Sequence, residues 1–334
     1  MYNIAVIGAT GLVGRKVLQV IEEQELEVAS LIPVASERSK GQKVMFRGED
    51  MEVVTIEEAI RSRPQLAIFS AGGAVSRAYA RKFAAIGCYV IDNSSAWRRE
   101  ATVPLVIPEV NASAITKGSY IIANPNCSTI QLVMVLAPLH QRFGIQRIVI
   151  ATYQSVTGSG LKGKNQLLDE RKGKTGEKAY PHPIDMNIIP HGGEFLPSGY
   201  TTEEEKLVFE TQKILNDGTI AVAPTVVRVP VTGGHSEAVN VQFRESVNAV
   251  QVREILMKQP GIIVMDDPGN AEYPMPVIAE DKDEVFVGRL RDDTSQPNTL
   301  DMWIVSDNLR KGAATNAVQI AKYIIENNFL RKND

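Results

Sequence analysis

Hydrophobic and polar positions alternate in blocks along the first half of the chain. Residues 2–7 form a short apolar run typical of a buried strand, and a glycine-rich turn separates it from a helical pattern at residues 15–21. Further strand patterns follow at residues 28–35, 53–54, 66–70 and 90–95. Strands that alternate with helices predict a parallel, doubly wound α/β (Rossmann-type) sheet, which binds its ligand at the carboxyl ends of its strands.

The second half of the chain has longer strand patterns and fewer helical ones. Apolar runs at residues 148–153, 220–229 and 238–243 predict a second, more antiparallel α+β domain. We expect the final helical pattern, at residues 313–323, to pack back on the first domain. Residues 161–178 are rich in lysine, glycine and acids and show little apolar periodicity, which favours a solvated surface insertion over a phosphate-binding lid.

Composition and charge exclude several classes of function. The 334 residues are 44% hydrophobic and 22% charged, with a net charge of −3, so no basic field favours nucleic acid or an anionic membrane. The two cysteines show no disulfide spacing, and the four histidines show no paired ligand spacing, so we expect a reducing compartment and no metal. No apolar stretch approaches the ~20 residues of a membrane helix, and the expected location is the cytoplasm.

Cys127 carries the strongest chemical signal. It lies in Asn124-Pro125-Asn126-Cys127-Ser128-Thr129, directly before an apolar helical run at residues 130–136. Pro125 cannot lie inside a regular helix and Ser128 and Thr129 are capping types, so the thiol is predicted at a helix N-terminus. Unpaired N–H groups there stabilise a thiolate, which is a strong nucleophile. Cys88 lies in an apolar strand-like run and is predicted to be an ordinary buried cysteine.

The glycine-rich turn after the first strand predicts a dinucleotide site. Its sequence, Gly8-Ala9-Thr10-Gly11-Leu12-Val13-Gly14, joins a strand to a helix, and this context places a pyrophosphate at the helix N-terminus. The predicted contacts within the turn are Gly8, Thr10, Gly11, Leu12 and Val13. The end of a later strand adds Gly72.

The choice of cofactor depends on the end of the second strand. Glu37 favours NAD, because an acid there binds the ribose hydroxyls. Ser36, Arg38 and Ser39 favour NADP, because they can hydrogen-bond and neutralise a 2′-phosphate. Three donors against one acid predict NADP.

Several blocks together resemble a known family. They occur in the same order as in the aspartate-β-semialdehyde dehydrogenases and run from residue 1 to about 325: Gly8–Gly14, Asn93–Arg98, Asn124–Thr129, Thr152–Gln154, Arg228–Pro230 and Gly234–Glu237. The resemblance implies a homodimer that carries out reversible NADPH-dependent reduction of L-aspartyl 4-phosphate to L-aspartate 4-semialdehyde, with release of phosphate. It also implies a role in the biosynthesis of lysine, threonine, methionine, isoleucine and diaminopimelate.

The reaction needs a nucleophile and an acid/base group. Cys127 would attack the acyl phosphate and form a thioester, which accepts a hydride. His235 lies in a glycine-rich turn between two strand patterns, and its pKa range suits proton transfer near sulfur. The alternative for His235, a hydrogen-bonded turn histidine, is weaker because a nucleophilic cysteine needs a partner.

The substrate's charged groups require complementary residues. Arg228, on a predicted strand, is suited to hold the α-carboxylate bidentately. Helical i,i+3 spacing places Glu203 and Lys206 on one face, and by resemblance Glu203 meets the ammonium group and Lys206 the phosphate. A solvated acidic helix start explains this run about as well. By resemblance, Arg98 is the second phosphate cation and Gln154 orients the substrate.

The resemblance also predicts domain bounds and further cofactor contacts. Residues 1–126, completed by a C-terminal helix at 308–334, form the NADP-binding domain, and residues 127–307 form the catalytic and dimerisation domain. Thr157, Gly158 and Asn308 are further predicted cofactor contacts. Two segments, Ser155–Gly160 and His191–Glu194, depart from the family's usual pattern.

Two other functions fit parts of the sequence. An N-acetyl-γ-glutamyl-phosphate reductase uses the same thioester chemistry, but its acylated amine needs no acidic partner, so Glu203 discriminates. A non-catalytic relative that keeps the fold for binding or assembly is the other, and the presence of both Cys127 and His235 argues against it.

Overall fold

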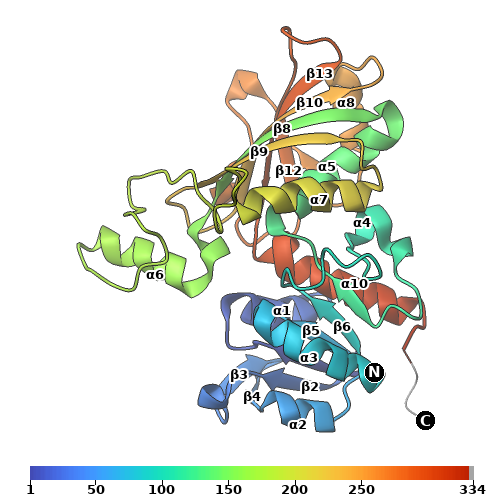
Figure 1. Ribbon diagram of the computed structural model, residues 1–334, viewed down its shortest axis with the longest axis vertical. Coiled ribbons are helices and arrows are strands. Elements are labelled where there is room, and N and C mark those ends of the chain that lie inside the picture. Colours follow the sequence, from blue (N-terminus) through green and yellow to red (C-terminus); the bar gives the residue numbers. More distant parts are fainter. Residues whose placement is uncertain (331–334) are drawn as a thin grey trace. The chain divides into compact units, whose positions relative to one another are not determined.

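The computed structural model describes residues 1–330, which fall into two compact units (Figure 1). The first comprises residues 1–125 and the segment that begins at residue 313, and the second comprises residues 126–312. Of the predicted C-terminal segment 308–334, residues 331–334 lie outside the described part. Assigning the cofactor and the chemistry to separate domains remains a prediction.

The first unit is built on a five-stranded sheet whose paired strands are all parallel, in the order β2-β1-β5-β6-β7. Its strands are β1 (Tyr2–Ile7), β2 (Val28–Val34), β5 (Leu66–Phe69), β6 (Tyr89–Asp92) and β7 (Ile121–Ala123). A separate hairpin pairs β3 (Lys43–Phe46) with β4 (Glu49–Glu52). The doubly wound α/β prediction is confirmed.

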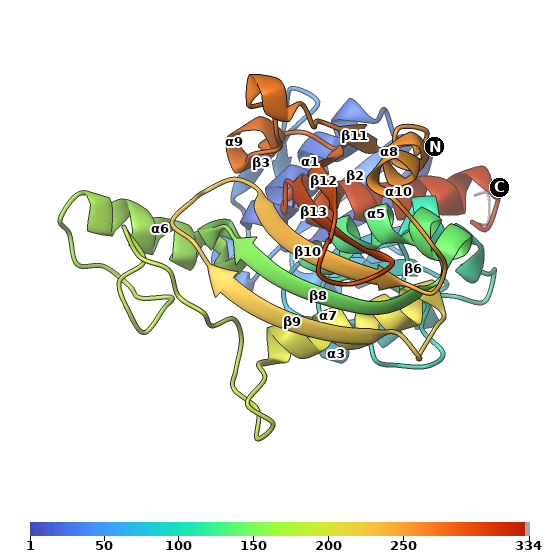
Figure 2. The ribbon, with the colours of Figure 1, turned by 90° about the horizontal axis from the view of Figure 1, so that it is seen from above.

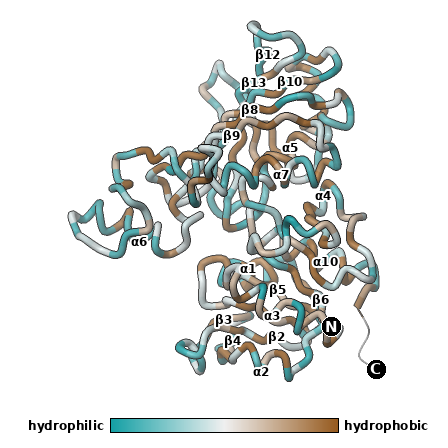
Figure 3. The backbone as a smooth tube through the Cα atoms, in the orientation of Figure 1, coloured by the Kyte–Doolittle hydropathy of each residue, from teal (hydrophilic) through white to brown (hydrophobic). Residues whose placement is uncertain are grey.

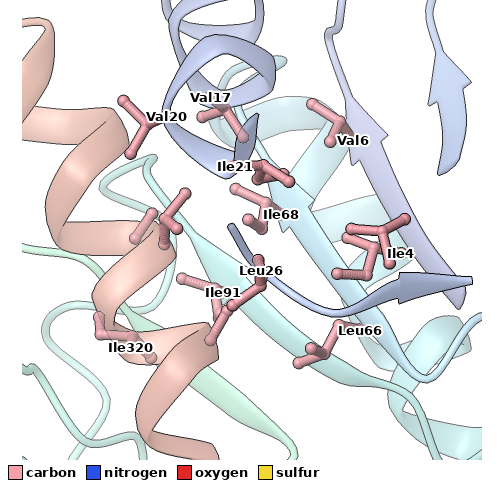
Figure 4. Close-up of a cluster of buried hydrophobic side chains, with 14 of the residues drawn as sticks. Ile4, Val6, Val17, Val20, Ile21, Leu26, Leu66, Ile68, Ile91 and Ile320 are labelled. Atoms are coloured by element: carbon pink, nitrogen blue, oxygen red, sulfur yellow. The ribbon is translucent and has the colours of Figure 1, made fainter. Parts of the chain in front are cut away.

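Helices bury their apolar faces against this sheet. They are α1 (Leu12–Glu23), α2 (Ile56–Arg61), α3 (Gly73–Ala85) and α10 (Thr315–Glu326). The short helix α4 (Pro108–Asn111) buries none of its residues and contacts α10. Figure 4 shows Val17 and Ile21 of α1 and Ile320 of α10 in one cluster with Ile68 and Ile91 of the strands. The C-terminal helix therefore completes the core of the first unit, as predicted, and burying each such side chain stabilises the fold by about 1.5–3 kcal/mol.

The second unit contains a six-stranded mixed sheet in the order β11-β12-β13-β10-β8-β9, with parallel pairs at its two edges. Its strands are β8 (Ile145–Gln154), β9 (Ala221–Arg228), β10 (His235–Phe243), β11 (Ile262–Val264), β12 (Val285–Asp292) and β13 (Thr299–Ser306). Figure 2 shows β8, β9 and β10 curving side by side. The central pairs are antiparallel, which confirms the more antiparallel second domain that was predicted.

One long helix, α5 (Cys127–Phe143), packs on β8, β10, β12 and β13 and also contacts α7 (Thr202–Leu215). The other helices of this unit are α6 (Gly160–Arg171), α8 (Ala249–Leu256) and α9 (Pro276–Ala279). Figure 3 shows hydrophobic residues concentrated on the strands and hydrophilic residues in the loops. Because α5 is buried along nearly its whole length, its first residue has a fixed position above the sheet.

The structure differs from the sequence prediction at three places. Residues 161–178, predicted as a solvated surface insertion, are mostly exposed, but α6 forms there and buries Leu167 with Val156 and Tyr180. Val54 makes only an isolated bridge to Val34 instead of a strand. His235 is not in a turn, since it begins β10.

Candidate active site

Cys127 is the first residue of α5, and its thiol is partly exposed. The residue that caps the helix is Asn126, whose Oδ1 accepts the Ser128 N–H at 3.0 Å, so the cap lies two residues before the Ser128-Thr129 pair that was predicted. Asparagine is among the strongest N-cap types. The predicted position of the thiol at a helix N-terminus is confirmed, and the remaining N–H groups there favour its ionised form.

Helix α7 holds the capping residue from both sides. The Asn126 backbone N–H donates to Glu210 Oε2 at 2.6 Å, and its Nδ2 donates to Glu203 Oε2 at 3.0 Å. Lys206 pairs with the other oxygen of Glu203, which confirms that these two residues share a face. Glu203 and Lys206, both predicted to bind the substrate, therefore form an ion pair with each other beside the start of α5.

The atypical segment at residues 191–194 fits tightly against α7. Gly193 has φ 77°, and a Cβ built there would lie 2.2 Å from Thr202 Oγ1. A Cβ on Gly192 would lie 2.6 Å from Val226 Cγ1 and 3.4 Å from Glu203 Cγ. Only glycine fits this close approach, so the two glycines of the atypical segment allow the chain to pack directly against Glu203.

Gly312 lies directly against the predicted nucleophile. A Cβ built on Gly312 would lie 2.9 Å from Cys127 Cβ. Its N–H donates to the Asp307 carbonyl at 3.0 Å, and Asp307 Oδ1 accepts the N–H groups of Leu309 and Arg310. This turn fixes Gly312, and any larger side chain there would displace the thiol.

The end of β8 links α5 to His235. Gln154 is buried, and its Nε2 donates to Ser128 Oγ at 2.9 Å. The next residue, Ser155, donates its backbone N–H to His235 Nδ1 at 3.0 Å. A backbone N–H can only donate, so Nδ1 accepts and the neutral ring carries its hydrogen on Nε2.

His235 is fully buried at the start of β10. Burial lowers its pKa to about 3, with a further lowering by the Arg228 charge that a Gly234 backbone hydrogen bond only partly offsets. Its Nε2 is buried and has no hydrogen-bond partner within residues 1–330. The ring is therefore neutral near pH 7 and has one N–H donor available for a ligand.

Arg228, at the end of β9, offers a second donor beside the first. Its Nη1 donates to the Ser155 carbonyl at 2.7 Å, and its guanidinium lies 5.9 Å from the centre of the Tyr180 ring. Its Nε is buried and lacks a partner in the described chain. A Cβ on Gly158 would lie 2.6 Å from Arg228 Nη1 and 3.2 Å from His235 Nε2, so both groups border this glycine.

A hydroxyl–amide network lies behind His235. Ser155 Oγ contacts Thr157 Oγ1 at 2.7 Å and Asn308 Oδ1 at 2.9 Å, and it lies 3.3 Å from His235 Nδ1. Asn308 Nδ2 is 3.1 Å from Thr157 Oγ1. Two residues predicted to contact the cofactor, Thr157 and Asn308, thus hold the loop that contacts the imidazole.

The first unit has a cavity of about 580 Å³ at the carboxyl ends of β1, β2 and β5. Four predicted cofactor residues line it: Gly8, Thr10, Gly11 and Ser36. Gly11 precedes α1 without a side-chain cap, and a Cβ on Gly14 would lie 2.0 Å from the Gly8 carbonyl oxygen. A glycine turn, an uncapped helix start and a cavity of this size fit a dinucleotide.

The other predicted residues of the first unit do not line this cavity. Leu12 and Val13 form the first turn of α1, Arg38 and Ser39 lie in a 3₁₀ turn after Ser36, and Gly72 precedes α3. Glu37, the alternative acid, does line it.

Arg98 also belongs to the first unit, and its Nη2 donates to the Asn93 carbonyl at 2.8 Å.

Cys88 is fully buried one residue before β6, and burial raises its pKa, which confirms its ordinary structural role.

Sequence reasoning missed several residues of both sites. Asn126 was recognisable, since asparagine after proline is an N-cap signal. Gly312, Glu210 and Gln131 gave no local signal, because their roles depend on segments far apart in the chain. The cavity lining adds residues of α2 and α3, among them Glu57 and Tyr79, which are joined by a 2.8 Å hydrogen bond.

Within residues 1–330 no helix is both long and apolar enough to cross a membrane.

Comparisons with known proteins agree with this geometry. Residues 3–118 match the family model described as semialdehyde dehydrogenase, NAD binding domain, and residues 136–311 match the semialdehyde dehydrogenase dimerisation domain. An Aquifex aeolicus aspartate-semialdehyde dehydrogenase is 47% identical, covering 97% of this chain and 98% of the relative.

Solved structures show the same likeness. The crystal structure of aspartate semialdehyde dehydrogenase II from Vibrio cholerae, complexed with ASA, is 44% identical with a TM-score of 0.93, covering 98% of each chain. The Candida albicans enzyme solved with NADP is 25% identical with a TM-score of 0.77, covering 99% of this chain and all of that one. The chain belongs to the aspartate-semialdehyde dehydrogenase family.

Proposed function

We propose that this enzyme catalyses the reversible, NADPH-dependent conversion of L-aspartyl 4-phosphate to L-aspartate 4-semialdehyde and phosphate through a thioester on Cys127. The observation that carries the proposal is the pair of buried, unpartnered N–H donors, Arg228 Nε and His235 Nε2, that border Gly158. Unsatisfied buried donors are costly, so a ligand with acceptor oxygens is the natural occupant of this site.

The proposed first step uses the thiolate at the start of α5. Its sulfur bonds to the acyl carbon, the bond from that carbon to the phosphate oxygen breaks, and phosphate leaves with the electron pair. Gln154 and the Asn126 cap fix the first turn of α5, and Gly312 leaves the thiol room for its attack. A nicotinamide cofactor, when bound, would supply the hydride for reduction of the thioester.

The tautomer of His235 defines its proposed role. Nε2–H donates to the carbonyl oxygen as negative charge develops on it, which stabilises the tetrahedral adduct on sulfur. When that adduct collapses to the aldehyde, the carbon–sulfur bond breaks and the thiolate is regenerated. In the reverse direction, the thiolate adds to the aldehyde carbon, and Nε2–H donates a hydrogen bond to the resulting oxyanion while the ring stays neutral.

We assign the substrate's charged groups to the predicted residues. Arg228 holds the α-carboxylate through its free Nε and its guanidinium edge. Glu203 receives the ammonium group and Lys206 the phosphate, so substrate binding exchanges their mutual ion pair for two pairs with the ligand. Arg98 is the proposed second phosphate cation.

NADP is the proposed cofactor. Gly8, Thr10, Gly11, Leu12 and Val13 would hold the pyrophosphate, with Gly72 nearby, and Ser36, Arg38 and Ser39 would hold the 2′-phosphate. The lining of the cavity by Ser36 supports this choice, and Glu37 in the same lining is the competing feature. Thr157, Gly158 and Asn308 are further proposed cofactor contacts.

We also infer the cellular setting from the family. A homodimer is supported by the match of residues 136–311 to a dimerisation-domain model. A cytoplasmic role in the biosynthesis of lysine, threonine, methionine, isoleucine and diaminopimelate follows from the proposed reaction.

Steady-state reduction of NADP with aspartate semialdehyde and phosphate tests the proposal. We expect turnover with this substrate, little with N-acetylglutamate semialdehyde, and loss of activity in Cys127→Ala to below about one per cent. Cys88→Ala is the matched control and should stay active. Preference for the N-acylated aldehyde, or substantial turnover without Cys127, would contradict the proposal.

A further inference from the structure

Glu237 is a fully buried carboxyl group that the proposed mechanism does not use. It lies on β10 two residues after His235, so the two side chains project from the same face of the strand. Within residues 1–330 neither of its carboxyl oxygens has a partner at hydrogen-bonding geometry, although the Gln131 side chain lies near enough to lower the pKa of the carboxyl as a donor. A buried, unpaired carboxyl costs several kcal/mol if it is ionised, so its retention beside His235 calls for a physical reason.

Two other orphaned polar atoms adjoin Glu237. Thr152 on β8 is its antiparallel register partner, and Thr152 Oγ1 is buried without a partner among the described residues. Gln131 on α5 is near enough to influence the pKa of Glu237, and Gln131 Oε1 is also buried and unpaired in that part of the chain. Three elements therefore direct unsatisfied polar atoms into one small region.

Gln131 connects this region to the proposed catalytic pair. It lies four residues after Cys127, on the same face of α5, and its Nε2 donates to the His235 carbonyl at 3.3 Å. That bond fixes which end of the amide faces His235, because a carbonyl can only accept. Oε1 then points away from His235 and needs a donor.

A neutral carboxylic acid would satisfy all three groups, whereas a carboxylate would not. Its O–H can donate to Gln131 Oε1, and its carbonyl oxygen can accept the Thr152 hydroxyl. A carboxylate has no proton to donate and would repel Oε1. Burial raises the pKa of Glu237 well above its usual value, against a smaller opposing effect of Gln131, which agrees with the neutral form.

We propose that Glu237 is a positioning residue that, as a neutral acid, holds Gln131 and thereby fixes the His235 backbone beneath the substrate. The role rests on the proposed function of His235. Glu237 touches neither substrate nor cofactor, and it acts through the amide. A loose amide would let the start of β10 shift and would misplace His235 Nε2.

Two substitutions separate this role from a charged one. Glu237→Gln keeps one donor and one acceptor and should retain kcat within about threefold. Glu237→Leu fills similar volume without either and should lower kcat roughly 10- to 100-fold with little change in KM. Gln131→Leu should cause a similar loss, and the double variant should lose no more than either alone, because the residues act in one chain. Thr299→Val, a buried polar change on β13, controls for general loosening and should leave kcat unchanged.

Infrared difference spectroscopy gives a readout that does not depend on activity. The spectrum of the wild type minus Glu237→Gln at neutral pH should contain the carbonyl band of a protonated carboxylic acid. Absence of that band, full activity of Glu237→Leu, or a Glu237→Gln variant as impaired as Glu237→Leu would overturn the proposal. If Glu237→Leu does not fold, the infrared band and Gln131→Leu decide. An active Cys127→Ala would instead refute the proposed function and leave the infrared result standing.

Discussion

At the scale of single residues, the hydrogen bonds that a side chain makes with its neighbours determine which of its donors remain for a ligand. The Ser155 N–H determines the tautomer of His235, and the Ser155 carbonyl occupies one arm of Arg228. The Nε–H of Arg228 and the Nε2–H of His235 remain without a partner within residues 1–330, in a buried setting where such donors interact strongly. Carbonyl recognition therefore depends on Ser155, which appears in no list of charged or nucleophilic groups.

The protonation of His235 can be observed directly. With a pKa of about 3, the ring should be neutral and carry its proton on Nε2 across about pH 5 to 8, as measured by ¹⁵N NMR of labelled histidine. His235→Gln identifies the resonance. Because the folded pKa lies below the usual value of 6.5, the stability that His235 contributes is complete above about pH 6.5 and is lost as pH falls towards 3. Titration of this resonance near pH 6.5 would contradict the buried environment.

Arg228 can be tested by a substitution that keeps its charge. Arg228→Lys loses the planar fork and the free Nε, so kcat/KM for aspartate semialdehyde should fall by about 2–4 kcal/mol, roughly 30- to 1,000-fold. Alkylation of Cys127 by iodoacetamide should keep its rate, since Arg228 does not bind the thiol in this account. Arg244→Lys, at an exposed ion pair with Asp217, is the control and should be near wild type. An equal effect of both substitutions would remove Arg228 from the substrate site.

Elements position these residues through their ends. Helix α5 presents Cys127 at its first residue, β8 ends at Gln154, β9 ends at Arg228 and β10 begins at His235. Strand ends on one edge of a sheet lie close together, and a helix end adds its N–H groups. The site is thus formed where two strands end and where a third strand and a helix begin.

The cap of α5 should matter for function as well as for stability. Asn126→Ala removes the bond to Ser128 and should lower the free energy of unfolding by about 1 kcal/mol, with a large loss of kcat because Cys127 follows the cap. Asn248→Ala removes an equivalent cap from α8, so it should cost similar stability and no activity. Chemical denaturation and steady-state kinetics of both variants make the comparison. Equal kcat in the two variants would show that the cap is only structural.

Sequence patterns predicted the parallel sheet and the more antiparallel second domain, because their strands carry apolar runs of the right length, but not the parallel pairs at the edges of the second sheet. They also placed Cys127 at a helix start and Glu203 beside Lys206, since both follow from local spacing. They placed His235 in a turn, because the glycines at 233 and 234 masked the register that pairs it with Ser306. The roles of Gly312, Gln131 and Glu237 arise from contacts between distant segments, which no local pattern contains.

At the scale of the whole molecule, one chain combines a cavity suited to a dinucleotide with the site proposed for the acyl phosphate. The first lies in the unit that residues 313–330 complete, and the second lies within residues 126–312. The C-terminal helix α10 returns to the first core, so both ends of the chain contribute to the cofactor-binding unit. Truncation before α10 would expose that core.

Cofactor choice is a property of this first unit. Arg38→Ala with Ser39→Ala should weaken NADPH binding by at least about tenfold and leave NADH almost unchanged, because only the 2′-phosphate contacts are lost. Glu37→Gln is the control and should not weaken NADPH binding relative to NADH binding. Fluorescence titration of both cofactors measures the ratio. An equal loss of affinity for both cofactors would show that Arg38 and Ser39 are structural, and the NADP assignment would fail.

The central claim is that Cys127 becomes acylated before any hydride moves. Mass spectrometry of the protein mixed with L-aspartyl 4-phosphate, without a nicotinamide cofactor, tests it most directly. We predict the release of about one equivalent of phosphate and an aspartyl adduct that maps to Cys127 and disappears with hydroxylamine. Cys127→Ala should give neither product. Phosphate release that requires NADPH, or an adduct on any other residue, would contradict the account.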